Sequence, residues 1–234
     1  MNKVKWTLNG KEVEFQEGAN LAQAIKSLGN PLPTICWDPG IEPSLGTCRV
    51  CSVKIDGRIG TSCTTEVRKG MVVESDTVEV KDLQKGVTEL LFVEGNHYCP
   101  SCEKSGDCQL QGVGYDLGMT HSRFPYKFET YELDYSGNRL ILERNRCVHC
   151  KRCTDLFVDD KGRKVFSFLG KGAETRVMMD HDLEKEMSEH KRTEAVELCP
   201  VGAIILKGRG FHRPIGERDS DHKHSEETHE GSKV

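Results

Sequence analysis

Residues 95–111 read GNHYCPSCEKSGDCQLQ, and three cysteines, Cys99, Cys102 and Cys108, fall within ten of these residues. The residues between them include proline, serine, glycine and aspartate, which favour turns over a core strand or an amphipathic helix. Cysteines this close together in a loop are typical of a metal site. A zinc ion or an iron–sulfur cluster usually takes four protein ligands, so the stretch lacks one. The other cysteines decide how the fourth position is filled.

Composition indicates that the cysteines are ligands. The chain has 234 residues, eleven of them cysteine, and the odd number does not suit a disulfide framework. No apolar run resembles a signal peptide or a transmembrane helix, so we expect a cytoplasmic protein whose thiols stay reduced. The net charge is −4, without large blocks of one sign, which argues against binding to nucleic acid.

The first cysteine set has the spacing C-x11-C-x2-C-x11-C and consists of Cys36, Cys48, Cys51 and Cys63. Plant-type ferredoxins hold their [2Fe–2S] cluster with C-x4-C-x2-C and a distant fourth cysteine, so only the first interval here is longer. The ferredoxin-like order of the surrounding elements favours a [2Fe–2S] cluster at this first site. A structural zinc ion is the alternative.

A second set, the third site along the chain, has the spacing C-x2-C-x2-C and a distant Cys-Pro. It consists of Cys147, Cys150, Cys153 and Cys199. Bacterial two-cluster ferredoxins use C-x2-C-x2-C-x3-C-P twice, and each fourth cysteine serves the other cluster. Phe157 stands where the first motif would have its fourth cysteine, and Glu189, Arg192 and Ala195 stand where the second would have its first three. The pattern predicts one retained [4Fe–4S] cluster. Zinc is again the alternative.

These two sets leave Cys99, Cys102 and Cys108 for a middle site, with no further thiol. The spacing C-x2-C-x5-C can hold three corners of a [4Fe–4S] cluster. His97 is the candidate fourth ligand, because imidazole can replace thiolate on iron, as it does in Rieske centres. A three-iron cluster, or a contribution from His121 or His149, is the alternative.

Patterning predicts α+β units around these sites. In residues 1–80, alternation through Val4, Trp6 and Leu8 leads to a hairpin at Asn9-Gly10. A helix over 21–28, a second hairpin at Asp56-Gly57 and closing strands at 72–73 and 78–80 follow. Helical periodicity marks residues 81–95, and residues 112–133 show none. Strands at 139–142, 165–168 and 203–206, with a helical turn at 194–198, complete the prediction.

The predicted domains are residues 1–80, 81–133 and 134–206, followed by a polar tail over 207–234. The tail includes His212, His222, His224 and His229. It is too polar to fold alone, so we hypothesise that another element holds it.

The three sets in this order resemble the N-terminal iron–sulfur region of the large, 75 kDa-type subunit of respiratory complex I, and that of [FeFe]-hydrogenases. In those families the middle site reads H-x3-C-x2-C-x5-C, whereas here the histidine stands at H-x-C. The segment Cys108-Gln109-Leu110-Gln111 also matches. Because the chain ends soon after the third site, it is most similar to the small diaphorase subunit (HoxU type) of NAD-reducing soluble [NiFe]-hydrogenases.

The resemblance implies three units: a [2Fe–2S] ferredoxin-like (β-grasp) domain, a small helical domain whose cluster has one histidine and three cysteine ligands, and a bacterial-ferredoxin-like [4Fe–4S] domain. It implies one [2Fe–2S] and two [4Fe–4S] clusters, and His97 as a ligand. The expected partners are a flavin- and NAD-binding large diaphorase subunit and the small and large [NiFe] hydrogenase subunits. Electrons would pass between the flavin side and the first site, then use the third site and finally the middle site on the hydrogenase side.

The chain would carry electrons without catalysing a reaction itself. The same relay in an NAD-linked formate dehydrogenase, a multimeric [FeFe]-hydrogenase or a complex I-like enzyme is the first alternative. A zinc-stabilised interaction module without a redox role is the second.

Overall fold

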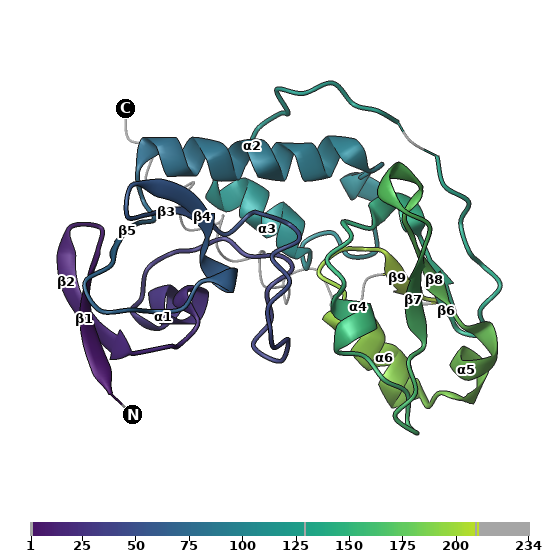
Figure 1. Ribbon diagram of the computed structural model, residues 1–234. Helices are drawn as coiled ribbons and strands as arrows, with labels where there is room; N and C mark the ends of the chain where they lie inside the picture. The colour runs from purple at the N-terminus through teal and green to yellow at the C-terminus, as the bar shows by residue number, and fades with distance from the viewer. Residues whose placement is uncertain (1, 129, 209, 211–234) are drawn as a thin grey trace, which may run out of the picture.

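The computed structural model describes residues 2–128, 130–208 and 210. The four histidines of the predicted tail, and almost all of the tail itself, lie outside the described residues. A five-stranded sheet with α1 lies at one end of the molecule, α2 runs along one side, and a second α+β unit lies at the other end (Figure 1). In the described part of the chain, no helix combines the length and apolarity needed to cross a bilayer.

The N-terminal unit is a mixed sheet of strand order β2-β1-β5-β3-β4. Its elements are β1 (Lys3–Leu8), β2 (Lys11–Gln16), α1 (Leu21–Ser27), β3 (Ser52–Ile55), β4 (Arg58–Thr61), a 3-10 turn (Ser62–Thr64) and β5 (Val72–Glu74). Both predicted hairpins are confirmed: β1 pairs with β2 and β3 with β4, antiparallel, through turns at Asn9-Gly10 and Asp56-Gly57. All four turn residues take the positive φ that such two-residue turns need.

The core of this unit lies between the sheet and α1. Alternate residues of β1, Val4, Trp6 and Leu8, are buried and pack with Leu21 and Ile25 of the helix. The Asn20 side chain accepts hydrogen bonds from the backbone N–H groups of Ala22 and Gln23, which caps the helix as such residues usually do. The sequence pattern therefore predicts both the sheet face and the helix that covers it.

The predicted closing strand at 78–80 is wrong. These residues form the first turn of α2 (Val78–Glu94), whose N-cap is Thr77. The Thr77 side chain accepts a hydrogen bond from the Val80 N–H group, and Val80 is fully buried. The β-branched valines suggested a strand, but the cap and the packing of α2 against β3 decide for a helix. The predicted boundary at residue 80 consequently lies inside α2.

A second helix was not expected in the region after the middle cysteines. The middle site includes a 3-10 turn (Cys99–Ser101) and is followed by α3 (Gln109–Asp116), which packs against α2. Gly112 and Gly114 weaken the helical signal in the sequence. Gly114 lies against the Phe92 ring, 3.5 Å from where its Cβ would be, so the two helices pack closely at this glycine. Residues 117–128 and 130–135 then pass along the molecule to the third unit (Figure 1).

The third unit consists of two small antiparallel sheets and three helices. Its elements are β6 (Leu140–Leu142), a 3-10 turn (Arg144–Arg146), α4 (Arg152–Asp155), β7 (Phe166–Leu169), a 3-10 turn (Gly172–Glu174), β8 (Arg176–Met179), α5 (His181–Glu186), α6 (Glu189–Leu198) and β9 (Ile204–Leu206). The predicted strands at 139–142, 165–168 and 203–206 are confirmed as β6, β7 and β9. The helical turn at 194–198 is part of the longer α6, and the sequence prediction missed β8 and α5.

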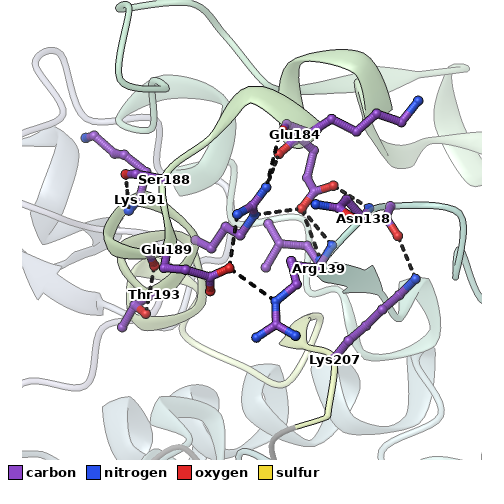
Figure 2. A network of polar contacts seen from close by, with 12 residues as sticks. Asn138, Arg139, Glu184, Ser188, Glu189, Lys191, Thr193 and Lys207 are labelled. Atoms are coloured by element: carbon purple, nitrogen blue, oxygen red, sulfur yellow. Dashed lines mark hydrogen bonds and ion pairs between the residues drawn. The ribbon is translucent and has the colours of Figure 1, made fainter.

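A buried carboxylate holds α5, α6 and β6 together. Glu184, which is fully buried, accepts hydrogen bonds from the backbone N–H groups of Asn138, Arg139 and Leu140 (Figure 2). Burial alone would raise its pKa, but these N–H groups and the guanidinium of Arg192 lower it below the usual value for glutamate. Arg192 Nε lies 3.0 Å from Glu184 Oε1, and both side chains are buried, so this is a buried, hydrogen-bonded ion pair.

Candidate metal centres

All eleven cysteines lie in the described part of the chain, and none forms a disulfide. Eight of the eleven belong to the first and third sites, and the other three to the middle site. In the described ranges, no group of three or more His, Cys, Asp or Glu side chains is arranged to hold a single metal ion.

The structure brings the four cysteines of the first site into mutual contact. The N–H group of Cys36 lies 3.5 Å from Cys48 Sγ, and that of Cys48 lies 3.5 Å from Cys36 Sγ. The Cys63 thiol meets the thiols of Cys36 and Cys51. Hydrogen bonds from Cys48 and Cys63 lower the pKa of Cys36, and the contact with Cys36 raises the pKa of Cys48 and of Cys63. Four buried, converging sulfurs are a donor set that fits an iron–sulfur cluster.

The third site is a cavity between α4, the strands β6 to β9 and the loops that carry the cysteines. All four cysteines line it, together with apolar side chains that include Leu142, Phe168, Val177 and Ile204. Burial raises the pKa of Cys147 to about 12, and it also raises the pKa values of Cys150 and Cys153. The charge of Cys199 raises all three pKa values further. Bare thiols therefore stay protonated here, and a cationic metal core would be needed to hold them as thiolates.

The middle site is more open. Cys102 is buried, whereas Cys99 and Cys108 are half-buried. Burial raises the pKa of Cys99, and it raises that of Cys108 to about 12. The charge of Cys102 raises both pKa values further, which indicates that the three sulfurs lie near one another.

His97 has the protonation state that a metal ligand needs. Burial, and next to it the charge of Arg146, lower its pKa to about 4, so the ring is neutral at pH 7. Its Nε2 atom is buried and has no hydrogen-bond partner among the described residues. The charge of Arg146 also lowers the pKa of Cys99, two residues further along the chain. A buried lone pair without a donor is costly, and a metal ion would satisfy it.

The two other candidate histidines are placed differently. His121 is exposed, and its Nδ1 atom lies 3.0 Å from the hydroxyl oxygen of Thr120. His149 is half-buried and packs edge-on against the Phe168 ring, with centroids 5.8 Å apart. Neither ring has, as His97 does, a buried nitrogen without a hydrogen-bond partner among the described residues.

Backbone N–H groups point at several of the sulfurs. Cys48, Cys147 and Cys150 each accept a hydrogen bond from the residue two positions later, and Cys108 accepts bonds from Leu110 and Gln111. Three non-glycine residues at the turns of these loops have positive φ angles: Arg49 (61°), His149 (50°) and Lys151 (65°). Non-glycine residues rarely adopt this conformation. It turns peptide N–H groups inward, where they stabilise thiolate charge and tune a cluster's potential. Spacing alone did not predict these strained residues.

Ordinary side chains fill the place of a second ferredoxin cluster. Ala195 and Phe157 are buried in the same core, and Lys191 lies over the Phe157 ring, 5.6 Å from its centroid. Arg192, at a position where the two-cluster pattern has cysteine, binds Glu184 and also Glu189, at 3.1 Å. A hydrophobic and ionic core stands where such ferredoxins hold their second cluster.

The first and third sites meet at a contact that we call the Trp37–Arg152 seam, between residues 37–40 and 150–156. Arg152 Nη2 donates a hydrogen bond to the Trp37 carbonyl oxygen at 2.8 Å. A Cβ on Gly40 would lie 3.0 Å from Leu156 Cδ2. The seam thus joins residues adjacent to ligand candidates of both sites.

The third and middle sites meet at the Cys102–Gly202 seam, between residues 102–109 and 196–202. A Cβ on Gly202 would lie 2.5 Å from Cys102 Sγ, so only glycine lets this sulfur pack on the backbone beyond Cys199. The Gln109 N–H group donates a hydrogen bond to the Pro200 carbonyl oxygen at 2.9 Å. Among the described residues, no backbone hydrogen bond links the first cysteine loops directly to the middle ones, so these contacts connect the third site to both of the others.

Comparison with known families divides the chain into three matched segments. Residues 1–78 match a 2Fe-2S iron-sulfur cluster binding domain. Residues 84–123 match the NADH-ubiquinone oxidoreductase-G iron-sulfur binding region. Residues 137–205 match the ferredoxin-like domain of NADH-quinone oxidoreductase subunit 3. Domains of the 2Fe-2S and ferredoxin-like iron–sulfur types are therefore present, and the zinc alternative receives no support from these matches.

Whole-chain relatives agree with the segments. The chain is 45% identical over 217 residues to the gamma chain of NAD-reducing hydrogenase HoxS of Cupriavidus necator, an alignment that covers 92% of each protein. It is 30% identical over 212 residues to the G chain of NADH-quinone oxidoreductase of Rickettsia prowazekii, covering 89% of this chain but 31% of that one. A crystal structure of NAD+-reducing [NiFe]-hydrogenase in the H2-reduced state contains a chain that superposes with a TM-score of 0.84 at 34% identity, covering 94% of both.

Fold, cysteine sites and matches define an iron–sulfur electron-transfer subunit of an oxidoreductase. More narrowly, the chain belongs to the family of gamma chains of NAD-reducing hydrogenases. It is also related through most of its length to part of the much longer complex I G chain, as the sequence resemblance predicted.

Proposed function

We propose that the chain relays electrons between a [NiFe] hydrogenase module and a flavin- and NAD-binding diaphorase module, in an enzyme that couples H2 oxidation to NAD+ reduction. The 45% identity to a hydrogenase gamma chain over 92% of both proteins carries this proposal. In this proposal the chain corresponds to the small diaphorase (HoxU-type) subunit. It would work in the cytoplasm, divided into units near residues 1–80, 81–133 and 134–206.

The proposed ligands follow the three sites. Cys36, Cys48, Cys51 and Cys63 would hold one [2Fe–2S] cluster, supported by the mutual contact of their sulfurs. Cys147, Cys150, Cys153 and Cys199 would hold a [4Fe–4S] cluster in the cavity that they line. The middle [4Fe–4S] cluster would be held by His97, Cys99, Cys102 and Cys108, and the orphaned Nε2 atom of His97 supports its assignment as the fourth ligand.

The two seams support the order of transfer. Because the third site contacts both of the others, we propose that an electron passes between the first and third sites and between the third and middle sites. Bound clusters would supply one-electron redox chemistry, and no proton needs to move. The chain's own residues fix the cluster positions, exclude water from the third site and provide N–H groups to the sulfurs.

Replacing Cys153 by serine tests the relay in the purified complex. We expect loss of the third cluster's EPR signal and loss of H2-driven NAD+ reduction, whereas NADH-driven dye reduction by the flavin subunit survives. The neighbouring Thr154→Ser variant keeps its hydroxyl, which bonds the Lys151 carbonyl at 2.9 Å, and should behave as wild type. Full H2–NAD+ activity without the third cluster would contradict the proposed path.

The alternative is the same relay in an NAD-linked formate dehydrogenase, a multimeric [FeFe]-hydrogenase or a complex I-like enzyme. Metal analysis of the large subunit that co-purifies with the chain distinguishes these enzymes. Nickel supports the hydrogenase proposal, whereas molybdenum or an iron-only centre contradicts it.

A further inference from the structure

Arg152 is a buried cation without an acidic partner. It is 6% exposed, and the structure's described residues provide no carboxylate within ion-pair distance. Its Nη2 atom donates to the Trp37 carbonyl, but its Nε atom is buried and has no acceptor in the same described set. A buried charge is costly unless a counter-charge accompanies it. An anion is therefore expected next to this guanidinium.

The other buried cations do not share this feature. Arg192 pairs with Glu184 at 3.0 Å, and Lys104 lies 3.5 Å from Asp107. Arg146, half-buried beside the middle site, binds Glu103 at 2.6 Å. Arg152 thus differs from every other lysine and arginine that the described structure buries.

Arg152 lies between the two neighbouring sites. It directly precedes Cys153, a ligand candidate of the third site, and its Nη2 atom binds the carbonyl oxygen of Trp37, which directly follows Cys36 of the first site. On the side of the first site, partial burial lowers the pKa of Lys26, and the charge of Arg152 lowers it further. The charge of Cys51 acts in the opposite direction and raises this pKa. The Lys26 ammonium lies 5.3 Å from the centroid of the Trp37 ring. A second cation, at an exposed position, therefore lies beside the seam that Arg152 occupies.

We propose that Arg152 provides a fixed positive charge shared by the clusters of the first and third sites, and that it raises the reduction potential of both. This inference rests on the proposed function. A cluster held by four thiolates is an anion, and an added electron makes it more negative. A guanidinium in a buried, low-dielectric seam stabilises that electron on either side.

The step that Arg152 influences is the transfer of one electron. One cluster would be oxidised by losing an electron and the other would be reduced by gaining it, with no bond or proton changing place. Because Arg152 lies between the two sites, it would favour reduction of both clusters together instead of creating a large potential difference between them.

The test is a redox titration of the purified complex followed by EPR, in wild type and in Arg152→Gln. We expect the midpoint potentials of the first and third clusters to shift together to more negative values, while that of the middle cluster changes least. Arg152→Lys restores the charge, so both midpoint potentials should return most of the way to their wild-type values. Arg58→Gln is the matched control, because Arg58 lies at an exposed position of β4, where solvent screens its charge.

Iron and sulfide content, measured first, separates this inference from the proposed function. If both clusters are present in Arg152→Gln and neither potential moves, or if Arg152→Lys fails to restore the shift, the inference is overturned while the relay stands. If Arg152→Gln fails to assemble its clusters, Arg152→Met decides, since it removes the charge and keeps an unbranched side chain. Unchanged potentials of the first and third clusters in that variant would refute the shared positive charge.

Discussion

The two seams differ in how they balance charge. At the Trp37–Arg152 seam, the buried guanidinium of Arg152 has no carboxylate partner among the described residues. At the Cys102–Gly202 seam, Lys104 accompanies Asp107 and Arg146 binds Glu103, so the protein neutralises its own cations. Each seam joins two candidate cluster sites, but the electrostatic environments of the two seams are opposite. In our proposal, the clusters would serve as counter-ions at the first of these seams, whereas the second has its own carboxylates.

They also differ in packing. At the Cys102–Gly202 seam the Cys102 sulfur rests on the Gly202 backbone, and Lys104 reaches across to the Val196 carbonyl at 3.2 Å. At the Trp37–Arg152 seam the tight contact involves the end of a flexible leucine side chain. We therefore expect substitutions to affect stability mainly at the Cys102–Gly202 seam, and to affect potentials mainly at the Trp37–Arg152 seam.

Lys104→Met should have the largest effect on stability. It removes the cation beside a carboxylate that is only 10% exposed, and breaking such a buried pair costs about 3 kcal/mol. Urea titration of the purified enzyme, followed by the cluster absorbance, measures the loss. The double variant Lys104→Met/Asp107→Asn should recover part of the stability. If the Lys104→Met variant resists urea as well as the wild type does, the stability of this seam does not depend on its ion pair.

Gly202→Ala should come next. Its Cβ would lie 2.5 Å from Cys102 Sγ, and relieving such an overlap costs about 1–3 kcal/mol. Because the displaced atom is a ligand candidate, iron content should fall and the EPR signal of the middle cluster should weaken before that of the first. Gly210→Ala, whose Cβ would have no atom of a described residue within 4 Å, is the control. An intact middle cluster in Gly202→Ala would mean that the two loops can separate.

Gly40→Ala should have the smallest effect. Its Cβ would lie 3.0 Å from Leu156 Cδ2, which can rotate away, and the alanine restricts the unfolded chain. The change in stability should stay within about 1 kcal/mol of zero. The same urea titration measures it, with Gly202→Ala alongside. A loss as large as that of Gly202→Ala would remove the packing difference between the seams.

The sequence predicts much of each site because cluster ligation depends on local spacing. The motif C-x2-C needs only a tight turn, so Cys48-x2-Cys51 and Cys147-x2-Cys150 are visible without knowledge of the fold. Hairpins at Asn9-Gly10 and Asp56-Gly57 are equally local, since the turn residues themselves supply the positive φ. Where a tertiary contact competes with propensity, prediction failed: Val78–Val80 resembled a strand, yet the Thr77 cap and the packing of α2 make it helical.

The amino-acid sequence by itself determined the cysteine sets, the two hairpins and the shortage of a thiol in residues 95–111. Only the tertiary structure decided which sites are neighbours, because Trp37 and Arg152 are 115 residues apart and the contact between Cys102 and Gly202 spans a similar separation. Charge balance likewise emerged only in three dimensions. Whether a buried cation has a carboxylate beside it depends on the side chains that folding brings together, and no spacing rule in the chain encodes that.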